Sequence, residues 1–242
     1  MPDAIFAHPR LAAVYDAFDG ARDDLPYYIA IADEVRATRI LDIGCGTGSL
    51  TVLLASGGRT VTAVDPAEAS LEIARGKATD LAVTWIHGDA TTVPPIMADL
   101  AVMTGNVAQV FRTDADWAQT LRGIRTALRP HGYFVFETRR PERRAWQDWA
   151  AATDPVVLDV APFGLVEQRN EVTDVSLPLV TFRSTYRFLG DGTVLTSEST
   201  LRFRSREQLE IGLAEAGYKV LDVREAPDRP GKEFVFLTRR TD

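Results

Sequence analysis

The stretch ILDIGCGTG, from Ile40 to Gly48, places glycines at positions 44, 46 and 48 directly after a short apolar run. The run Ile40–Ile43 has the character of a buried strand. Glycine loses more conformational freedom on folding than other residues, so three alternate glycines are costly unless the backbone must stay bare. The stretch therefore predicts a tight turn from a strand into a helix, with a ligand lying against the turn.

Composition limits the classes of protein to consider. The chain has 242 residues, of which 45% are hydrophobic, enough for one well-packed core. Its net charge of −7 disfavours a nucleic-acid partner, because such binding relies on clustered lysine and arginine. No apolar run reaches the roughly 18 residues of a membrane span, and the first residues lack the pattern of a signal peptide. We therefore expect a cytoplasmic protein, monomeric or homodimeric, without a membrane partner.

Cysteine and histidine are scarce. Cys45 is the only cysteine, which excludes a disulfide within the chain and cysteine-rich metal sites. The three histidines, His8, His87 and His131, lie far apart in the sequence. We therefore expect no metal site.

Short apolar runs alternate with amphipathic stretches from about residue 39 onward. Helix-start signals lie between the runs, notably Asp65-Pro66 and an N-cap at Thr113. Such alternation favours a doubly wound α/β fold, a parallel sheet with helices on both faces. The strands are predicted at 40–43, 60–64, 82–86, 100–103 and 133–137.

The pattern changes after Arg140. Between Gly164 and Phe203, alternating residues predict three antiparallel strands, with a hairpin turn at Gly190-Asp191-Gly192. A helix is then predicted to begin with a capping box at Ser205 and to end at Gly217. Two closely linked runs, 218–224 and 233–238, predict a final antiparallel pair.

These patterns divide the chain into three parts. Two amphipathic helices are predicted before residue 39, over 11–18 and 25–35. We expect residues 1–38 to form an N-terminal helical cap, residues 39–140 and 204–242 to form the ligand-binding core, and residues 141–203 to form a β-rich insert. The insert is expected to be a lid over the site or an interaction element.

Three kinds of ligand are compatible with a glycine-rich turn. A P-loop is excluded because no Gly-Lys-Ser/Thr follows. The dinucleotide pattern requires a small apolar residue at 49, where Ser49 stands, and has no glycine at the position of Gly48. The remaining pattern is Asp-x-Gly-x-Gly-x-Gly, from Asp42 to Gly48, which resembles motif I of the class I S-adenosylmethionine (SAM)-dependent methyltransferases.

Further stretches share this resemblance. Asp65, in VTAVDPA, follows the turn by roughly 20 residues, where an acid holds ribose hydroxyls in such folds. HGDATTVP resembles the adenine-binding segment, with Asp89 and Ala90 in the contacting positions. MTGNVAQVF resembles the loop beneath the adenosine, reached by the backbone of Thr104 and Gly105. LRPHGYFVFET resembles the turn before the fifth strand, with His131 in place of the usual glycine.

The resemblance covers residues 39–139 and 205–240. It implies a Rossmann-like, mostly parallel seven-stranded sheet with an antiparallel last strand, and S-adenosyl-L-methionine as the cofactor. The residues that it places at the cofactor are Asp42, Gly44, Cys45, Gly46, Gly48, Asp65, Pro66, Asp89, Ala90, Thr104 and Gly105.

The acceptor is less well defined by the sequence. We expect methyl transfer to an oxygen or nitrogen of a small molecule. The alternatives are a protein or RNA methyltransferase, or a non-catalytic SAM-binding regulatory module. Catalytic roles are unassigned, with Tyr15, Asn106 and Glu137 as candidate polar groups at the sheet edge.

The insert and the residues near Tyr15 are expected to line the acceptor cavity, with Tyr186 facing inward. Four arginines of the insert also form a candidate cluster. A carboxylate-bearing acceptor could pair with them, although a solvated face balanced by glutamates is the favoured interpretation. They are Arg183, Arg187, Arg202 and Arg204.

Overall fold

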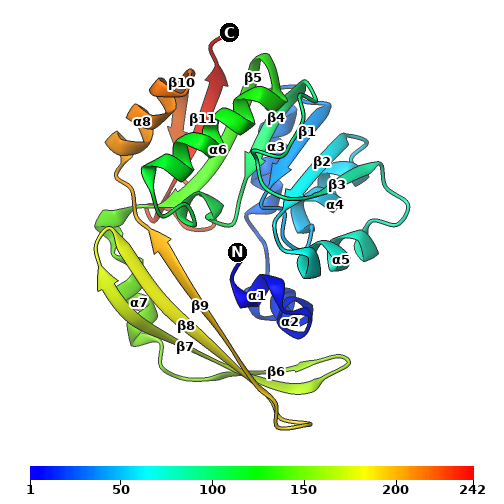
Figure 1. The fold of residues 1–242 in the computed structure, drawn as a ribbon, viewed down its shortest axis with the longest axis vertical. Helices are drawn as coiled ribbons and strands as arrows, with labels where there is room; N and C mark the ends of the chain where they lie inside the picture. Colours follow the sequence, from blue (N-terminus) through cyan, green and yellow to red (C-terminus); the bar gives the residue numbers. More distant parts are fainter.

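The core of the protein is a seven-stranded sheet in the order β10-β11-β5-β4-β1-β2-β3 (Figure 1). The computed structural model describes residues 1–242. Strands β1 to β5 are parallel, and β11 runs antiparallel to both β5 and β10. The mostly parallel sheet with an antiparallel last strand is thus confirmed. The strands are β1 (Arg39–Ile43), β2 (Thr60–Asp65), β3 (Val83–His87), β4 (Ala98–Met103), β5 (Leu128–Arg139), β10 (Tyr218–Arg224) and β11 (Glu233–Arg240).

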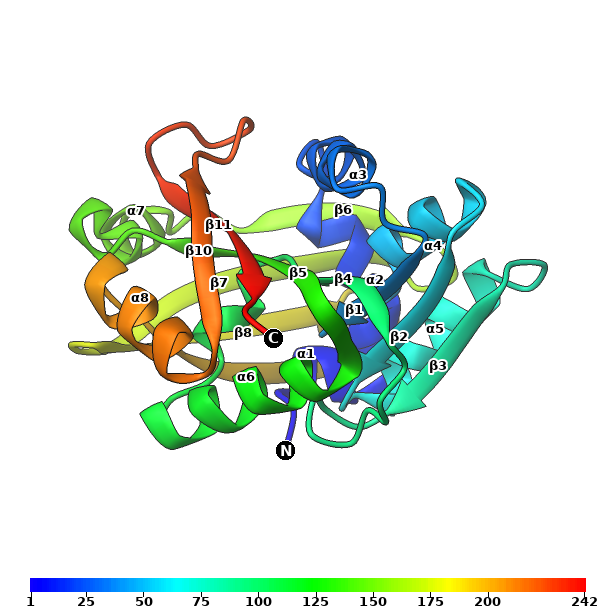
Figure 2. The same ribbon diagram turned by 90° about the horizontal axis from the view of Figure 1, so that it is seen from above.

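Helices cover both faces of this sheet, because alternate strand residues project to opposite sides. Phe134 and Phe136 of β5 pack on the face covered by α6 and α8, whereas Val135 packs on the face covered by α3 and α4 (Figure 2). The helices of the core are α3 (Leu25–Glu34), α4 (Ser49–Ser56), α5 (Glu68–Lys77), α6 (Asp114–Ala127) and α8 (Arg206–Glu215), with a 3₁₀ turn η1 (Val107–Gln109) after β4.

Local signals explain where several helices begin. The Thr113 side chain accepts from the Asp116 amide at the start of α6, and Ser205 and Gln208 form the predicted capping box of α8. The helix expected at Asp65-Pro66 begins instead at Glu68, because Asp65 and the two residues after it form the end of β2 and a turn.

The insert is a separate four-stranded antiparallel sheet in the order β6-β7-β8-β9. The three predicted strands are present as β7, β8 and β9, but β6, the mostly exposed edge strand, was not predicted. Its residues lack the alternation of a half-buried strand. The elements are η2 (Pro141–Arg143), α7 (Ala145–Ala151), β6 (Val156–Val160), β7 (Gly164–Ser176), β8 (Leu179–Phe188) and β9 (Val194–Arg202).

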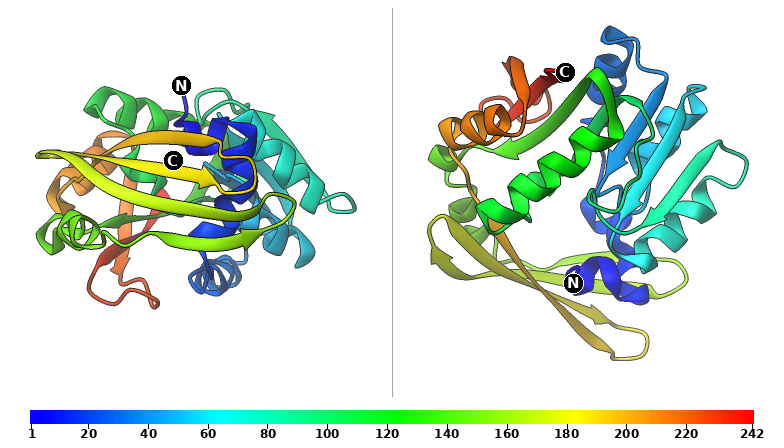
Figure 3. Two further views of the ribbon diagram at one scale, coloured as in Figure 1. Left: turned by 90° about the horizontal axis from the view of Figure 1, so that it is seen from below. Right: turned by 45° about the horizontal axis from the view of Figure 1, so that its top comes forward.

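Two short helices at the N-terminus, α1 (Ala4–Ala7) and α2 (Pro9–Asp19), lie between the core and the insert sheet (Figures 1 and 3). Leu11 and Val14 of α2 pack with Val166 and Phe188 of the insert in one apolar cluster, which Ile5 of α1 joins. By contrast, α3 packs against the core sheet through Tyr28 and other buried residues. The packing therefore favours a cap made of α1 and α2 alone, with α3 in the core layer.

Candidate functional site

The glycine-rich turn joins β1 to α4 at the C-terminal edge of the parallel strands. Gly44, Gly46 and Gly48 have φ angles of 66°, 53° and 81°, the left-handed region that favours glycine. The amides of Gly44 and Cys45 donate to the Val64 carbonyl oxygen of β2 at 2.8 and 3.2 Å. The turn is therefore held between two adjacent strands.

The glycines of this region have different roles. A Cβ on Gly44 would lie 2.8 Å from the Val107 side chain, and one on Gly48 would lie 2.8 Å from the Ala74 Cβ. A Cβ on Gly46 would meet no atom within 4 Å, and the same holds for Gly105 after β4, which also has a positive φ. Gly44 and Gly48 thus permit close packing, whereas Gly46 and Gly105 present bare backbone to open space.

Asp65 ends β2 and is buried beside the turn. Its Oδ2 accepts from the Gly46 amide at 2.9 Å, and its Oδ1 accepts from the Ala67 amide at 2.8 Å. Burial raises the pKa of this carboxyl group, although both amide donors oppose the rise. The next residue, Pro66, accepts from a ring nitrogen of His87 at 3.0 Å through its carbonyl oxygen.

Asp42 lies in β1, beneath the turn. Its Oδ2 accepts from the Thr51 hydroxyl of α4 at 2.5 Å. Burial, which disfavours the charged form, raises the pKa of Asp42 to about 6, and the negative charge of Asp65 adds to the rise. At neutral pH the Asp42 carboxylate therefore carries a negative charge beneath the turn, and burial of this charge lowers the stability of the folded protein.

Asp89 and Ala90 follow β3. Asp89 is exposed, and its Oδ1 accepts from the amide and hydroxyl of Thr91 at 2.8 and 2.6 Å. Ala90 is buried against α6, where a Cβ on Gly123 would come within 2.3 Å of the Ala90 carbonyl oxygen. Sequence reasoning missed Gly123, which this close approach requires.

The loop Thr104-Gly105-Asn106 follows β4 and rests on a buried carboxylate. Glu137 at the end of β5 accepts from the Gly105 and Asn106 amides through Oε1, at 2.6 and 3.2 Å. Its Oε2 accepts from the Tyr28 hydroxyl of α3. Burial and the nearby Glu233 raise the pKa of Glu137. Glu137 is fully buried, with one oxygen bonded to the loop and the other to Tyr28, so the geometry favours support of the loop over contact with a substrate.

Asn106 adopts a left-handed backbone conformation and is buried. Its Nδ2 donates to Glu233 Oε1 of β11 at 3.0 Å, an arrangement that fixes which amide atom is nitrogen. Asn106 Oδ1 and Glu233 Oε2 are buried without a hydrogen-bond partner. Such orphaned acceptors are uncommon in folded proteins.

The cap helix α2 lies over the glycine-rich turn. Thr47, within the turn, donates its hydroxyl hydrogen to Asp16 of α2, and Lys77 of α5 pairs with the same carboxylate. Tyr15 packs against Phe6, with their ring centroids 5.3 Å apart. Burial and the nearby Asp19 raise the pKa of Tyr15, so its hydroxyl group stays protonated at neutral pH.

One face of the insert sheet carries polar residues in its middle. The strand register places Gln168 opposite Tyr186, and Ser184 between Asn170 and Ser197. The Gln168 side chain donates to the Tyr186 hydroxyl at 2.6 Å, and Ser184 donates to Asn170 at 2.7 Å. We name this set the polar band; its members are Gln168, Asn170, Ser184, Tyr186, Ser197 and Ser199.

The polar band faces the cap. Ser197 accepts from the Ile5 amide of α1 at 2.9 Å, and Tyr186 packs edge-on against Phe18 of α2. Apolar clusters flank the band at both ends, one built on α1 and α2 and the other on Trp146 and Phe203. Sequence reasoning identified Tyr186 alone, because the other members are small or polar residues of ordinary strand alternation.

The four arginines of the insert do not form one cluster. Arg183 makes an exposed ion pair with Glu198, and Arg187 is exposed on the same strand. Arg202 and Arg204 instead hold the start of α6, where Arg202 pairs with Asp114 at 2.9 Å and Arg204 donates to the Phe111 and Thr113 carbonyl oxygens. This agrees with the favoured interpretation of a solvated face, at least for β8.

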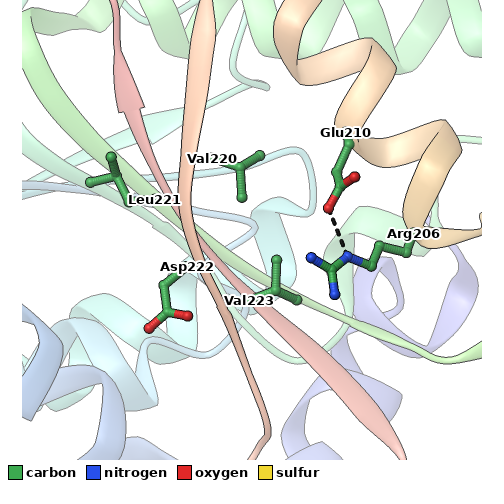
Figure 4. Close-up of a pocket in the computed structure, with 6 residues that line it drawn as sticks. All are labelled: Arg206, Glu210, Val220, Leu221, Asp222 and Val223. Carbon is green, nitrogen blue, oxygen red and sulfur yellow. Dashed lines mark hydrogen bonds and ion pairs between the residues drawn. The ribbon is translucent and has the colours of Figure 1, made fainter.

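One surface pocket lies beside α8 and β10, and another lies at the end of β5. The first, of about 500 Å³, contains the Arg206–Glu210 ion pair (Figure 4). Because β11 and β5 separate β10 from β4, this cavity is remote from the turn. The second, of about 330 Å³, is lined by Arg139, Trp149 and Glu233, among others. Through Glu233 it adjoins Asn106.

The residues at the sheet edge fit a SAM cofactor. The bare backbone at Gly46 and Gly105 leaves space that a side chain would fill. Asp65 is a buried acceptor beside that space, and Asp42 supplies negative charge beneath it.

No group of three or more histidine, cysteine or acidic side chains is arranged to hold a metal ion. No helix is long and apolar enough to cross a membrane.

Comparison with known families agrees with this geometry. Residues 40–132 match a family model described as a methyltransferase domain. The biotin biosynthesis bifunctional protein of Cellvibrio japonicus is 30% identical over 145 residues, which make up 57% of this chain and 28% of that protein. The chain spans between about a quarter and a half of the length of the first curated relatives it matches.

Solved structures share the fold over nearly the whole chain. A sugar N-methyltransferase from Streptoalloteichus sp. superposes with a TM-score of 0.78 at 18% identity, covering 95% of this chain and 93% of that one. A SAM-bound amino pentose methyltransferase from Micromonospora echinaspora gives a TM-score of 0.72 at 21% identity, covering 93% and 95%. The insert is therefore included in the shared architecture.

Proposed function

Because the chain belongs to the class I SAM-dependent methyltransferases, we propose that it methylates a nitrogen or oxygen atom of a small polar molecule. The observation that carries this proposal is the buried Asp65 carboxylate held against the Gly46 amide, beside backbone left bare at Gly46 and Gly105. Two of the structural relatives, which methylate sugars by their descriptions, support a small-molecule acceptor.

The cofactor would lie across the C-terminal ends of β1, β2, β3 and β4. Asp65 would accept hydrogen bonds from the ribose hydroxyls, and the segment Asp89–Ala90 would contact the adenine. Asp42 would complement positive charge through its field rather than by contact, since it lies beneath the turn. When bound, SAM would supply an activated methyl carbon: a nucleophile attacks it in line with the carbon–sulfur bond, S-adenosylhomocysteine leaves, and the proton of the N–H or O–H nucleophile passes to solvent.

The acceptor would lie between this edge, the cap and the polar band. Hydroxyl and amide groups of the band offer donors and acceptors to a polar molecule. Tyr15, protonated at neutral pH, would donate a hydrogen bond and is unsuited to accept a proton. We therefore propose that positioning, rather than acid–base chemistry, provides most of the acceleration.

The cofactor assignment is tested by calorimetric titration of S-adenosylhomocysteine (SAH), the demethylated cofactor. Asp65→Asn should weaken SAH binding by about 1–3 kcal/mol, because it replaces a charged acceptor with a neutral amide. The matched control is Asp80→Asn, at an exposed aspartate remote from the turn, which should leave the affinity unchanged. An unchanged affinity in Asp65→Asn would refute the proposed site.

The activity is tested by transfer of labelled methyl groups from SAM to a panel of small amines, amino sugars and hydroxylated compounds. Turnover of at least one small polar compound is expected. SAH binding together with turnover of protein or RNA substrates alone would overturn the proposed acceptor class. Binding without any turnover would favour a regulatory SAM-binding module instead.

A further inference from the structure

The cavity of about 330 Å³ at the end of β5 is rich in cationic side chains. It lies between α7, the strand ends of β5 and β11, and the loop of residues 225–232. Four cationic residues line it, together with two acidic residues. They are Arg139, Arg143, Arg229 and Lys232, with Asp148 and Glu233.

The acidic residues do not neutralise this lining. Glu233 pairs with Arg229 at 2.9 Å and lies 3.8 Å from Arg139. Arg143 donates to the Gly231 carbonyl oxygen at 2.7 Å but has no carboxylate partner, and Lys232 makes no ion pair. The lining therefore has two more cationic than acidic groups, and Asp228 beside it offsets one of these charges, in a protein whose net charge is −7. A concave site with an excess of one sign of charge attracts ions of the other sign.

Two of the cationic groups, Arg139 and Arg229, are held in place. Arg139 donates to the buried Gln109 side chain at 3.0 Å, and its guanidinium lies 5.1 Å from the centre of the Trp149 ring. Arg229 is fixed by Asp228 at 2.7 Å as well as by Glu233. Guanidinium groups fixed in this way lose little freedom on binding a planar or tetrahedral anion.

The cavity adjoins the proposed site of methyl transfer. Glu233 in its wall accepts from Asn106, which follows Gly105 in the loop after β4. Arg139 follows Glu137, the support of that loop, by two residues along β5. The buried contact between Asn106 and Glu233 thus separates the loop from the cavity by the width of two side chains.

We propose that this cavity binds an anionic group of the acceptor, a carboxylate or a phosphate. Arg143 and Lys232, which lack carboxylate partners, contact the anion, and Arg139 and Arg229 form the cationic wall behind them. The opposite end of the acceptor carries the nucleophilic atom and lies toward the loop after β4. This inference rests on the proposed methyltransferase function and narrows its substrates to anionic small molecules.

The test uses the full chain saturated with SAH, titrated separately with inorganic pyrophosphate and with succinate at low ionic strength. At least one of the two anions should bind, and added sodium chloride should weaken its binding. The double variant Arg143→Met/Lys232→Met, which keeps the apolar stems, should weaken that binding at least tenfold. The matched control Arg183→Met/Arg187→Met removes two exposed cations of the insert and should have no effect.

Pyrophosphate binding alone would identify a phosphate site, and succinate binding alone would identify a carboxylate site. The proposal is overturned if neither anion binds at millimolar concentration, or if the double variant binds as the unmodified chain does. SAH affinity is measured for every variant, so that a failure of the proposed anion site can be distinguished from a failure of the cofactor assignment. Loss of anion binding with unchanged SAH affinity supports the cavity, whereas absent SAH binding in the unmodified chain would refute the proposed function.

Discussion

At the scale of single residues, the glycines of the turn show why a repeated residue type need not have a repeated role. Gly44 and Gly48 are required because Val107 and Ala74 occupy the space of a side chain. Gly46 has open space beside it, so packing does not explain its lack of a side chain. Its φ of 53° favours glycine for the backbone alone, and the open space beside it is where we expect the cofactor to lie.

Gly46→Ala should therefore affect binding more than stability. A left-handed backbone costs a non-glycine residue roughly 1–2 kcal/mol, and the added methyl group would project toward the cofactor. SAH affinity, measured by calorimetry, should fall at least tenfold. Gly58→Ala is the matched control, with φ of 81° and open space in the turn before β2. It should cost similar stability and leave SAH affinity unchanged; equal affinities in both variants would contradict the role of Gly46.

Asp42 predicts a pH dependence of stability. Its pKa in the folded protein, about 6, is above its ordinary value of 3.8, so the folded state holds the proton more tightly than the unfolded chain. The contribution of Asp42 to the free energy of unfolding is therefore fully present only below about pH 4. It is lost as the pH rises through 6. Asp42→Asn does not titrate. Relative to the unmodified chain, its free energy of unfolding should increase by about 2 kcal/mol between pH 4 and pH 7.5.

Urea unfolding at both pH values measures the free energy of unfolding of Asp42→Asn and of the unmodified chain. Comparing the two pH values removes any effect of the substitution that does not depend on pH. Asp80→Asn, at an exposed site, provides the comparison. If the difference between Asp42→Asn and the unmodified chain stays constant with pH, the buried charge at Asp42 is not the cause.

At the scale of elements, the loop after β4 is held by a helix distant in sequence. Tyr28 of α3 donates to Glu137, which in turn accepts from the amides of Gly105 and Asn106. Helix α3 thus covers the sheet and also supports the loop after β4 through Tyr28. Removing the tyrosine donor leaves one oxygen of a buried carboxylate without its partner.

Tyr28→Phe should therefore lower the free energy of unfolding by about 1–3 kcal/mol and also weaken SAH binding, because the loop loses its support. Tyr133→Phe is the matched control, since the Tyr133 hydroxyl makes no hydrogen bond within the chain. Chemical unfolding and calorimetry measure the two quantities. A loss of stability with unchanged SAH affinity would limit Tyr28 to a structural role.

At the scale of the whole molecule, the cofactor is expected to stabilise the fold by mass action. At SAH concentrations of 100 times Kd, binding adds about 2.7 kcal/mol, which for a chain of this length corresponds to a rise in Tm of about 5 to 11 °C. Differential scanning calorimetry should show this rise. ATP and NAD at the same concentrations should leave Tm unchanged, and a comparable rise with NAD would contradict the cofactor assignment.

The three parts of the molecule also meet at the site. The cap contacts the glycine-rich turn through Asp16 and the insert through Ile5. The insert contacts the start of α6 through Arg202. The acceptor is therefore expected to meet all three parts, whereas the cofactor meets mainly the core.

The local pattern determined much of the fold. The strands around the glycine-rich turn and the final pair were predicted within a few residues, because period-2 alternation and turn residues are local signals. The unpatterned edge strand β6 and the four-residue helix α1 gave no such signal. His131 takes φ of 60°, so it occupies the left-handed turn position that the resemblance assigns to glycine.

The sequence by itself determined the strand–turn–helix at Asp42–Gly48 and the order of the cofactor segments, since each depends on residues close together in the chain. Only the tertiary structure decided the roles of side chains that meet across long separations. It placed Glu137 under the loop, Glu233 beside Asn106, and Arg139, Arg143 and Lys232 around one cavity. The physical reason is that burial, pairing and cavity shape depend on which elements pack together, and no local pattern encodes that choice.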